Sequence, residues 1–248
     1  IKDSLKFASI DIGSNAMRLL FCRVIEDKDS PKFIKESLFR MPLRLGHDAF
    51  TDGVISEENS MKLIDTVGAF QLMIKAYDPI AFRSCATAAL RTALNGKKLV
   101  DEINAKVNVD LEIISGNEEA RIIMANHIED HLDPKKNYLY VDVGGGSTEI
   151  SFISNRQKIS SKSFPIGSVR LLENQVTEND WVDMEKWINK NMSKHKGHFK
   201  AIGSGGNINK IFSMSQLKRK SEIDISTIQS VLDIIEPLSI QNRITQLG

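Results

Sequence analysis

The sequence contains little cysteine and no excess of charge of either sign. Its two cysteines, Cys22 and Cys85, lack the spacing of metal ligands, and each lies in or beside an apolar run, which predicts buried thiols in a reducing compartment. Lysine and arginine number 33 and aspartate and glutamate 32, so no overall field favours nucleic acid or a membrane as a partner. Any site for an anion must therefore be local.

Long hydrophobic runs and two common nucleotide-binding signatures are also missing. No segment approaches the length of a membrane span, and the first six residues do not resemble a signal peptide, so we expect a cytoplasmic protein. No segment matches the dinucleotide fingerprint or the Gly-Lys-Ser of a phosphate loop, which disfavours a Rossmann dehydrogenase and a P-loop NTPase. The 248 residues, 41% of them hydrophobic, suffice for one large domain or two of ordinary size.

The most informative stretch is residues 138–153, in which three consecutive glycines separate two apolar, β-rich runs. This pattern predicts a strand, a turn and a strand. Because the glycines at 144–146 carry no Cβ, their N–H groups can approach an anion closely, and the Ser147 hydroxyl adds a donor. Asp142 and Glu149 flank the turn and would repel a phosphate unless a cation such as Mg²⁺ lay between them. A glycine-rich hairpin with incidental acids is the alternative.

A similar pattern occurs about half a chain earlier. A predicted strand over residues 7–11 enters a Gly-Ser turn, and residues 17–25 form the returning strand. Asp11 precedes its turn as Asp142 precedes the glycines, which suggests an internal duplication with one anion loop per copy. Taken alone, Asp11 is equally compatible with a turn-forming side chain that bonds to nearby backbone.

The segment between the two turns contains a candidate anion-binding arginine. A predicted helix over residues 56–77 follows a polar loop at 46–53 and precedes a buried strand at 80–82. The alanine-rich residues 86–94 favour a further helix. Arg91 lies in that helix, at the sheet edge where α/β proteins bind ligands, although a lone arginine on a helix is usually solvated.

A second segment of interest carries two adjacent glutamates. A strand at residues 111–115 leads into an amphipathic helix over residues 117–132, which we expect to bridge two lobes. Glu118 and Glu119 lie in its first turn, where the helix dipole ordinarily accounts for acidic residues. A catalytic role requires one of them to face a cleft. The apolar side of the helix is expected to hold Ile122, Ile123 and Ile128.

The second half continues with a predicted strand at residues 157–164, a short helix through Leu172 and a longer helix capped at Thr177. A strand at 199–202 then enters a third glycine turn, residues 203–207, which opens a helix. Backbone N–H groups at such a turn can bind a phosphate, and the turn can also pack closely on a nucleoside.

Five motifs occur in a fixed order along the chain: DIGSNAMRLL, the alanine-rich segment with Arg91, SGNEEAR, VDVGGGSTE and AIGSGGN. In this combination the sequence resembles the exopolyphosphatase and guanosine pentaphosphate phosphohydrolase (Ppx/GppA) family of the actin-like ATPase superfamily. The resemblance implies an α/β fold of two ribonuclease-H-like lobes, each with a mixed five-stranded sheet, and an interlobe cleft. We expect the lobes at residues 1–124 and 125–248.

The resemblance also implies roles for individual residues. Glu119 matches the family's catalytic glutamate, which positions or deprotonates the attacking water. Asp142 and Glu149 match the acids that hold Mg²⁺ or Mn²⁺. The positions that match phosphate- and substrate-binding residues are Asp11, Gly13, Ser14, Asn15, Arg91, Gly144, Gly145, Gly146, Ser147, Gly203 and Gly205.

The implied function is metal-dependent release of the terminal phosphate from inorganic polyphosphate or from guanosine pentaphosphate (pppGpp). Two alternatives stay open: a small-molecule kinase or ATPase of the same superfamily, and a non-catalytic sensor that binds polyphosphate or (p)ppGpp. Because the sequence stops about where family members continue, we expect poor processivity on long polymers unless a homodimer supplies further surface.

Overall fold

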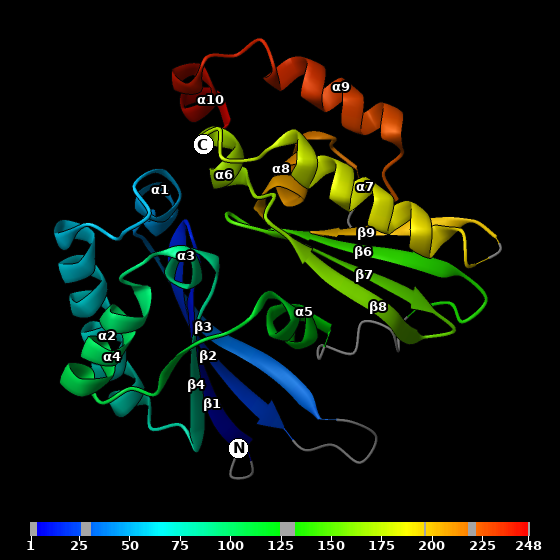
Figure 1. Ribbon diagram of the computed structural model, residues 1–248. Coiled ribbons are helices and arrows are strands. Elements are labelled where there is room, and N and C mark those ends of the chain that lie inside the picture. Colours follow the sequence, from blue (N-terminus) through cyan, green and yellow to red (C-terminus); the bar gives the residue numbers. More distant parts are fainter. Residues whose placement is uncertain (1–3, 26–30, 125–131, 196, 218–221, 248) are drawn as a thin grey trace.

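The computed structural model describes residues 4–25, 31–124, 132–195, 197–217 and 222–247, which form two mixed β-sheets and their surrounding helices (Figure 1). The elements of the first half are β1 (Ser4–Ile12), β2 (Ala16–Ile25), β3 (Lys32–Pro42), α1 (Leu45–Thr51), α2 (Glu57–Tyr77), β4 (Ala81–Ala86), α3 (Ala88–Thr92), α4 (Gly96–Val107), β5 (Leu111–Ile113) and α5 (Gly116–Met124). The strand order is β3-β2-β1-β4-β5. Strands β1, β2 and β3 are antiparallel, whereas β1, β4 and β5 are parallel.

The second sheet repeats the arrangement of the first. Its half of the chain contains β6 (Asn137–Val143), β7 (Thr148–Ser154), β8 (Gln157–Phe164), α6 (Ser168–Leu172), α7 (Glu178–Met192), β9 (Phe199–Ser204), α8 (Gly206–Met214), α9 (Ile225–Ile235) and α10 (Ile240–Leu247). The order β8-β7-β6-β9 places β6, β7, β8 and β9 where the first sheet has β1, β2, β3 and β4, with the same directions. This repetition agrees with the predicted duplication.

The second sheet has four strands in the described part of the chain, one fewer than predicted. In the first sheet the fifth strand, β5, follows α3 and α4 and pairs with β4. After β9, the described residues instead form the helices α8, α9 and α10, and no described segment pairs with the outer side of β9.

The helices cover the sheets because their apolar residues recur at helical spacing. The buried apolar residues of α2, the helix predicted over residues 56–77, are Leu63, Val67, Phe70 and Ile74. Ser56 caps this helix by accepting a hydrogen bond from the Asn59 N–H at 3.3 Å. The predicted capping box of α7 is present, since Thr177 and Asp180 bond reciprocally. In the second half, Trp187 of α7 packs against a core that contains Ile150 and Phe164.

Two helical segments differ from the expectation. Residues 46–53 are not a polar loop but contain most of α1, because Leu45 and Ala49 lie one turn apart and are buried together with Phe50. The helix expected over residues 86–94 is only the five-residue α3, and α4 follows it as a helix that was not predicted. Residues 93–95 separate the two helices, and α4 begins at Gly96, where a Cβ would overlap the Leu90 carbonyl oxygen.

Helix α5 lies between the two sheets (Figure 1) and packs against β7 and β8. Its Ile123 contacts a core that contains Tyr138, Tyr140 and Ile153. The expected continuation of this helix, including Ile128, falls in residues 125–131, outside the described residues. The start of α5 therefore places the predicted glutamate pair between the halves of the protein.

Both cysteines are half-buried free thiols, whereas buried thiols were predicted. Cys85 lies near the end of β4 and lines the cavity described below, which accounts for its partial exposure. Among the residues that the structure describes, no helix is both long enough and apolar enough to cross a membrane.

Candidate active site

A cavity of about 620 Å³ is lined by residues at the carboxyl ends of β1 and β6. Most of the predicted site residues line it: Asp11, Gly13, Ser14, Asn15, Glu119, Asp142, Gly144, Gly145, Gly146, Ser147, Glu149 and Gly205. Arg91 lines an adjoining cavity of about 380 Å³. Gly203 lines neither cavity and instead lies against Ile208, whose Cγ1 would be 2.9 Å from a Cβ at this position. The fold thus brings residues from five motifs to one place.

The two hairpin turns have the same backbone geometry and face each other. The Gly13 N–H donates to the Ala16 carbonyl at 3.1 Å, and the Gly144 N–H donates to the Ser147 carbonyl at 2.9 Å. A Cβ at Gly145 would lie 3.1 Å from Cβ of Ser14 in the opposite turn. Glycine at this position therefore allows the close approach of the two halves.

Hydrogen bonds to its carbonyl groups fix the orientation of the glycine turn. The Gly145 carbonyl accepts from the Val169 N–H at 2.8 Å, and the Gly146 carbonyl accepts from Arg170 Nε at 2.8 Å. In the described part of the chain, the N–H groups of Gly145 and Gly146 have no acceptor. Because both residues line the cavity, these two donors are available to a bound anion.

The two hairpins differ in charge at one equivalent position. Asp11 pairs across its hairpin with Arg18, and their side chains form an ion pair at 2.9 Å. In the second hairpin the equivalent of Arg18 is Glu149, which pairs with Asp142. Directly opposed residues have Cβ atoms about 5 Å apart, so two carboxylates oppose each other here. The second hairpin therefore fits a positive ligand, whereas the first is already neutralised.

Glu119 has a partly unsatisfied, buried carboxylate. Its Oε2 atom is buried and has no hydrogen-bond partner among the described residues. The Arg91 Nη1 atom forms an ion pair with it at 3.5 Å, beyond the usual hydrogen-bond distance. Arg91 Nη1 instead donates to the Ile114 carbonyl at 2.7 Å. Burial, followed by the charge of Glu149, raises the pKa of Glu119 to about 7, although Arg91 opposes the shift. Such a group can exchange a proton near neutral pH.

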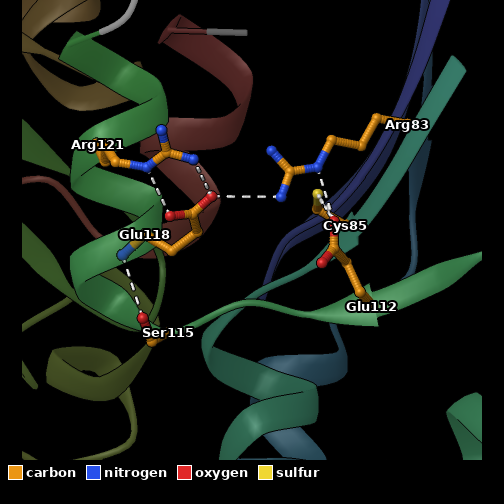
Figure 2. A network of polar contacts seen from close by, with 6 residues as sticks. All are labelled: Arg83, Cys85, Glu112, Ser115, Glu118 and Arg121. Atoms are coloured by element: carbon orange, nitrogen blue, oxygen red, sulfur yellow. Dashed lines mark hydrogen bonds and ion pairs between the residues drawn. The ribbon is translucent and has the colours of Figure 1, made fainter.

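The neighbouring Glu118 has the opposite environment. Figure 2 shows its carboxylate between Arg121 and Arg83, with bonds of 2.7 Å to Arg121 and an ion pair of 3.3 Å to Arg83. Arg83 is held in turn by Glu112 of β5 at 2.7 Å. Hydrogen bonds from Arg121, followed by those from Arg83, lower the pKa of Glu118 to about 2. Only the second glutamate of the pair therefore has the environment of a proton acceptor.

The acids of the second hairpin fit a hard divalent cation. Burial raises the pKa of Glu149, although hydrogen bonds from Ser163, at 2.7 Å, and from Ser147 oppose this shift. The described residues contain no group of three or more metal-ligating side chains arranged to hold a metal alone. Mg²⁺, however, is commonly bound by one or two carboxylates together with substrate phosphates and water. Asp142 and Glu149 are suited to that mode.

Several arginines near the site were not predicted from the sequence. They are Arg18, Arg40 and Arg83 in the main cavity and Arg170 in the smaller one. Arg170 donates to the Gly146 carbonyl and, from Nη2, to the Thr92 hydroxyl at 3.1 Å, and its guanidinium lies 4.0 Å from the centroid of the Phe50 ring. It therefore links the glycine turn to α1 and α3. The only sequence signal for Arg170 was its position shortly after the Pro-Ile-Gly-Ser segment at residues 165–168.

The pKa of Glu119 predicts a particular pH dependence of stability. Its folded-state pKa is raised, so the folded protein binds more protons than the unfolded chain between about pH 4.5 and 7, and its free energy of unfolding falls as pH rises through that window. Between pH 4 and pH 9, the free energy of unfolding of Glu119→Gln should therefore rise by about 3 kcal/mol relative to that of the unsubstituted protein. Urea unfolding with chelator present measures this difference.

Glu118→Gln is the matched control for that measurement. The pKa of Glu118 is lowered, so its contribution to stability is present above about pH 4.5 and is lost as pH falls toward 2. Its pH dependence therefore has the opposite sign. If the free energy of unfolding of Glu119→Gln did not rise relative to that of the unsubstituted protein between pH 4 and pH 9, the Glu119 carboxylate would not be desolvated as the structure indicates.

The fold and the cavity define an α/β protein with two mixed sheets, in which two duplicated hairpin turns line one cavity. The model of the Ppx/GppA phosphatase family matches residues 25–236, and the chain therefore belongs to this family.

Individual relatives agree with this membership. Over 229 residues the chain is 32% identical to a bifunctional 3-dehydroquinate synthase/phosphatase of Fusobacterium nucleatum, covering 83% of this chain and 33% of that protein. Over 192 residues it is 24% identical to exopolyphosphatase 1 of Mycobacterium bovis, covering 73% and 55% respectively. A solved structure of the Aquifex aeolicus Ppx/GppA enzyme superposes with a TM-score of 0.74 at 24% identity, covering 98% of this chain and 84% of that one. The chain thus spans about a third to about half the length of these curated relatives.

Proposed function

We propose that the protein is a metal-dependent phosphohydrolase that releases the terminal phosphate of a phosphoanhydride chain. The observation that carries this proposal is the buried Oε2 atom of Glu119, which accepts no hydrogen bond from the described residues. It lies in a cavity that also presents the N–H groups of Gly145 and Gly146, for which the described residues provide no acceptor. A proton acceptor beside an anion cradle is the arrangement that attack of water on phosphorus requires.

The proposed reaction assigns a task to each group. The Glu119 carboxylate accepts a proton from water, the water oxygen bonds to the terminal phosphorus, and the bond from phosphorus to the bridging oxygen breaks. The N–H groups of Gly145 and Gly146 and the Arg91 guanidinium stabilise the charge on the phosphoryl oxygens. A bound divalent cation would neutralise further phosphate charge. The products are orthophosphate and a chain shorter by one phosphate.

We propose inorganic polyphosphate or pppGpp as the substrate. One relative is named an exopolyphosphatase, and both candidate substrates are polyanions that end in a phosphoanhydride. Arg40 also lines the main cavity and would attract such a chain. A phosphate-transferring kinase of the same superfamily is the second candidate, because an anion cradle of this kind also suits ATP.

A comparison of substrates tests the proposal. With Mg²⁺ or Mn²⁺ present, we expect phosphate release from polyphosphate, from pppGpp or from both, and less than about one hundredth of that rate with chelator, because phosphate charge would then lack a counterion. Asp142→Asn should show the same loss. The assay measures free phosphate, in parallel with transfer from ATP to an added acceptor. Transfer without release would identify a kinase, and binding of either substrate without any turnover would identify a sensor.

A further inference from the structure

The smaller cavity adjoins the main one at the glycine turn. The two cavities share three lining residues, Ala88, Gly146 and Ser147. Two of these belong to the turn that the proposed reaction uses to hold the terminal phosphate. An anion released at this turn therefore has the smaller cavity, of about 380 Å³, as its immediate neighbour.

The linings of the two cavities differ in charge. The main cavity is lined by four carboxylates and three arginines. The described lining of the smaller cavity contains two arginines, Arg91 from the first half of the chain and Arg170 from the second, and no acidic side chain. Although Glu119 forms an ion pair with Arg91 at 3.5 Å, the lining of the smaller cavity is the more favourable surrounding for a free anion.

Both arginines have donors left after their observed hydrogen bonds. Arg91 donates from Nη1 to the Ile114 carbonyl, and the same nitrogen forms an ion pair with Glu119 at 3.5 Å. Arg170 donates from Nε to the Gly146 carbonyl and from Nη2 to the Thr92 hydroxyl. A guanidinium carries five N–H groups, so each arginine can donate further hydrogen bonds into the cavity.

The two guanidinium groups also act unfavourably on each other. Burial lowers the pKa of Arg170, Asp180 partly offsets that shift, and the charge of Arg91 lowers the pKa further. An anion between the two groups would offset both effects. Gly116 allows α5 to approach β8 beside this cavity, because a Cβ there would lie 2.6 Å from Cβ of Ser163.

We propose that the smaller cavity binds orthophosphate, the product of the reaction proposed above, as it leaves the glycine turn. Arg91 and Arg170 hold the anion by charge-assisted hydrogen bonds. The Ser115 hydroxyl accepts the Glu118 N–H at 3.1 Å and keeps its own O–H to donate. The identity of the anion rests on the proposed function, since that reaction is what produces phosphate at this turn.

Asn117→Asp tests this site. Asn117 is an exposed lining residue in the first turn of α5, and the substitution adds a negative charge at nearly constant size. A carboxylate several ångströms from the anion, in partly aqueous surroundings, should weaken phosphate binding about fivefold. Equilibrium dialysis of radiolabelled inorganic phosphate measures the affinity, with chelator present so that no divalent cation assists the main cavity. Asn189→Asp on α7, outside both cavities, is the matched control.

We expect the unsubstituted protein and Asn189→Asp to bind phosphate equally, and Asn117→Asp to bind it about fivefold more weakly. Equal affinity in all three proteins, or no binding by the unsubstituted protein, overturns the site. The measurement involves no turnover and is therefore independent of the proposed function. A protein that binds phosphate as expected but hydrolyses neither substrate keeps the site and loses the hydrolase assignment.

Discussion

Replacement of Glu119 by glutamine is expected to reduce phosphate release about 10³-fold, the range in which a general base contributes to catalysis. Glutamine has nearly the same size and cannot accept the proton from water at neutral pH. The neighbouring groups that bind phosphate, including the N–H groups of Gly145 and Gly146, do not change. Binding of polyphosphate or pppGpp, measured by ligand-dependent thermal stabilisation, should therefore persist.

Glu118→Gln separates the effect of position from the effect of losing a carboxylate in this turn. Glu118 faces Arg121 and Arg83 and lines neither cavity, so its amide variant should keep phosphate release within about threefold of the unsubstituted rate. The assignment of Glu119 as the base would be rejected by normal turnover in Glu119→Gln. It would equally be rejected if both variants lost the same activity.

Replacement of Gly146 by alanine is expected to lower phosphate release by about 100-fold or more. A Cβ at this position would lie 2.6 Å from Cβ of Ala88, 2.7 Å from Cζ of Phe50 and 2.8 Å from Oγ of Ser14, all in the first half of the chain. These contacts are closer than van der Waals distance, so the glycine turn must move away from the opposite turn. A displacement of about 1 Å at a reacting centre can cost about 100-fold in rate.

Gly68→Ala is the matched control for this substitution. Gly68 lies within α2, and a Cβ there would meet no atom within 4 Å. Alanine should therefore raise the free energy of unfolding by roughly 0.5–1 kcal/mol and leave activity unchanged. Urea unfolding and the phosphate assay give both quantities. Full activity in Gly146→Ala would mean that close contact of the two turns is not needed for catalysis.

Local patterns predicted most of the architecture. The strand-acid-turn pattern at Asp11 and again at Asp142 led to the two repeated sheets, because alternation and glycine turns act over only a few residues. The helix predicted over residues 56–77 depended on equally local signals. Helix α1 was missed because its polar positions, such as Asp48, hide a short apolar face that only burial against the first core reveals.

The candidate site was predicted less completely than the fold. On its own residues, Arg91 was indistinguishable from a solvated helical arginine, and its position beside Glu119 depends on the packing of α5 between the sheets. Arg170 was missed altogether, because its partners Phe50 and Thr92 are far away in the chain. Long-range contacts of this kind leave no periodic signal in a single sequence.

The sequence by itself determined where strands, glycine turns and most helices form, because those choices depend on side chains within a few positions of one another. Only the tertiary structure decided which of two adjacent glutamates is desolvated, since Glu118 meets two arginines while Glu119 is buried near Glu149. The physical reason is that a pKa depends on burial and on charges in space. Both are properties of the packed halves and not of the order of residues.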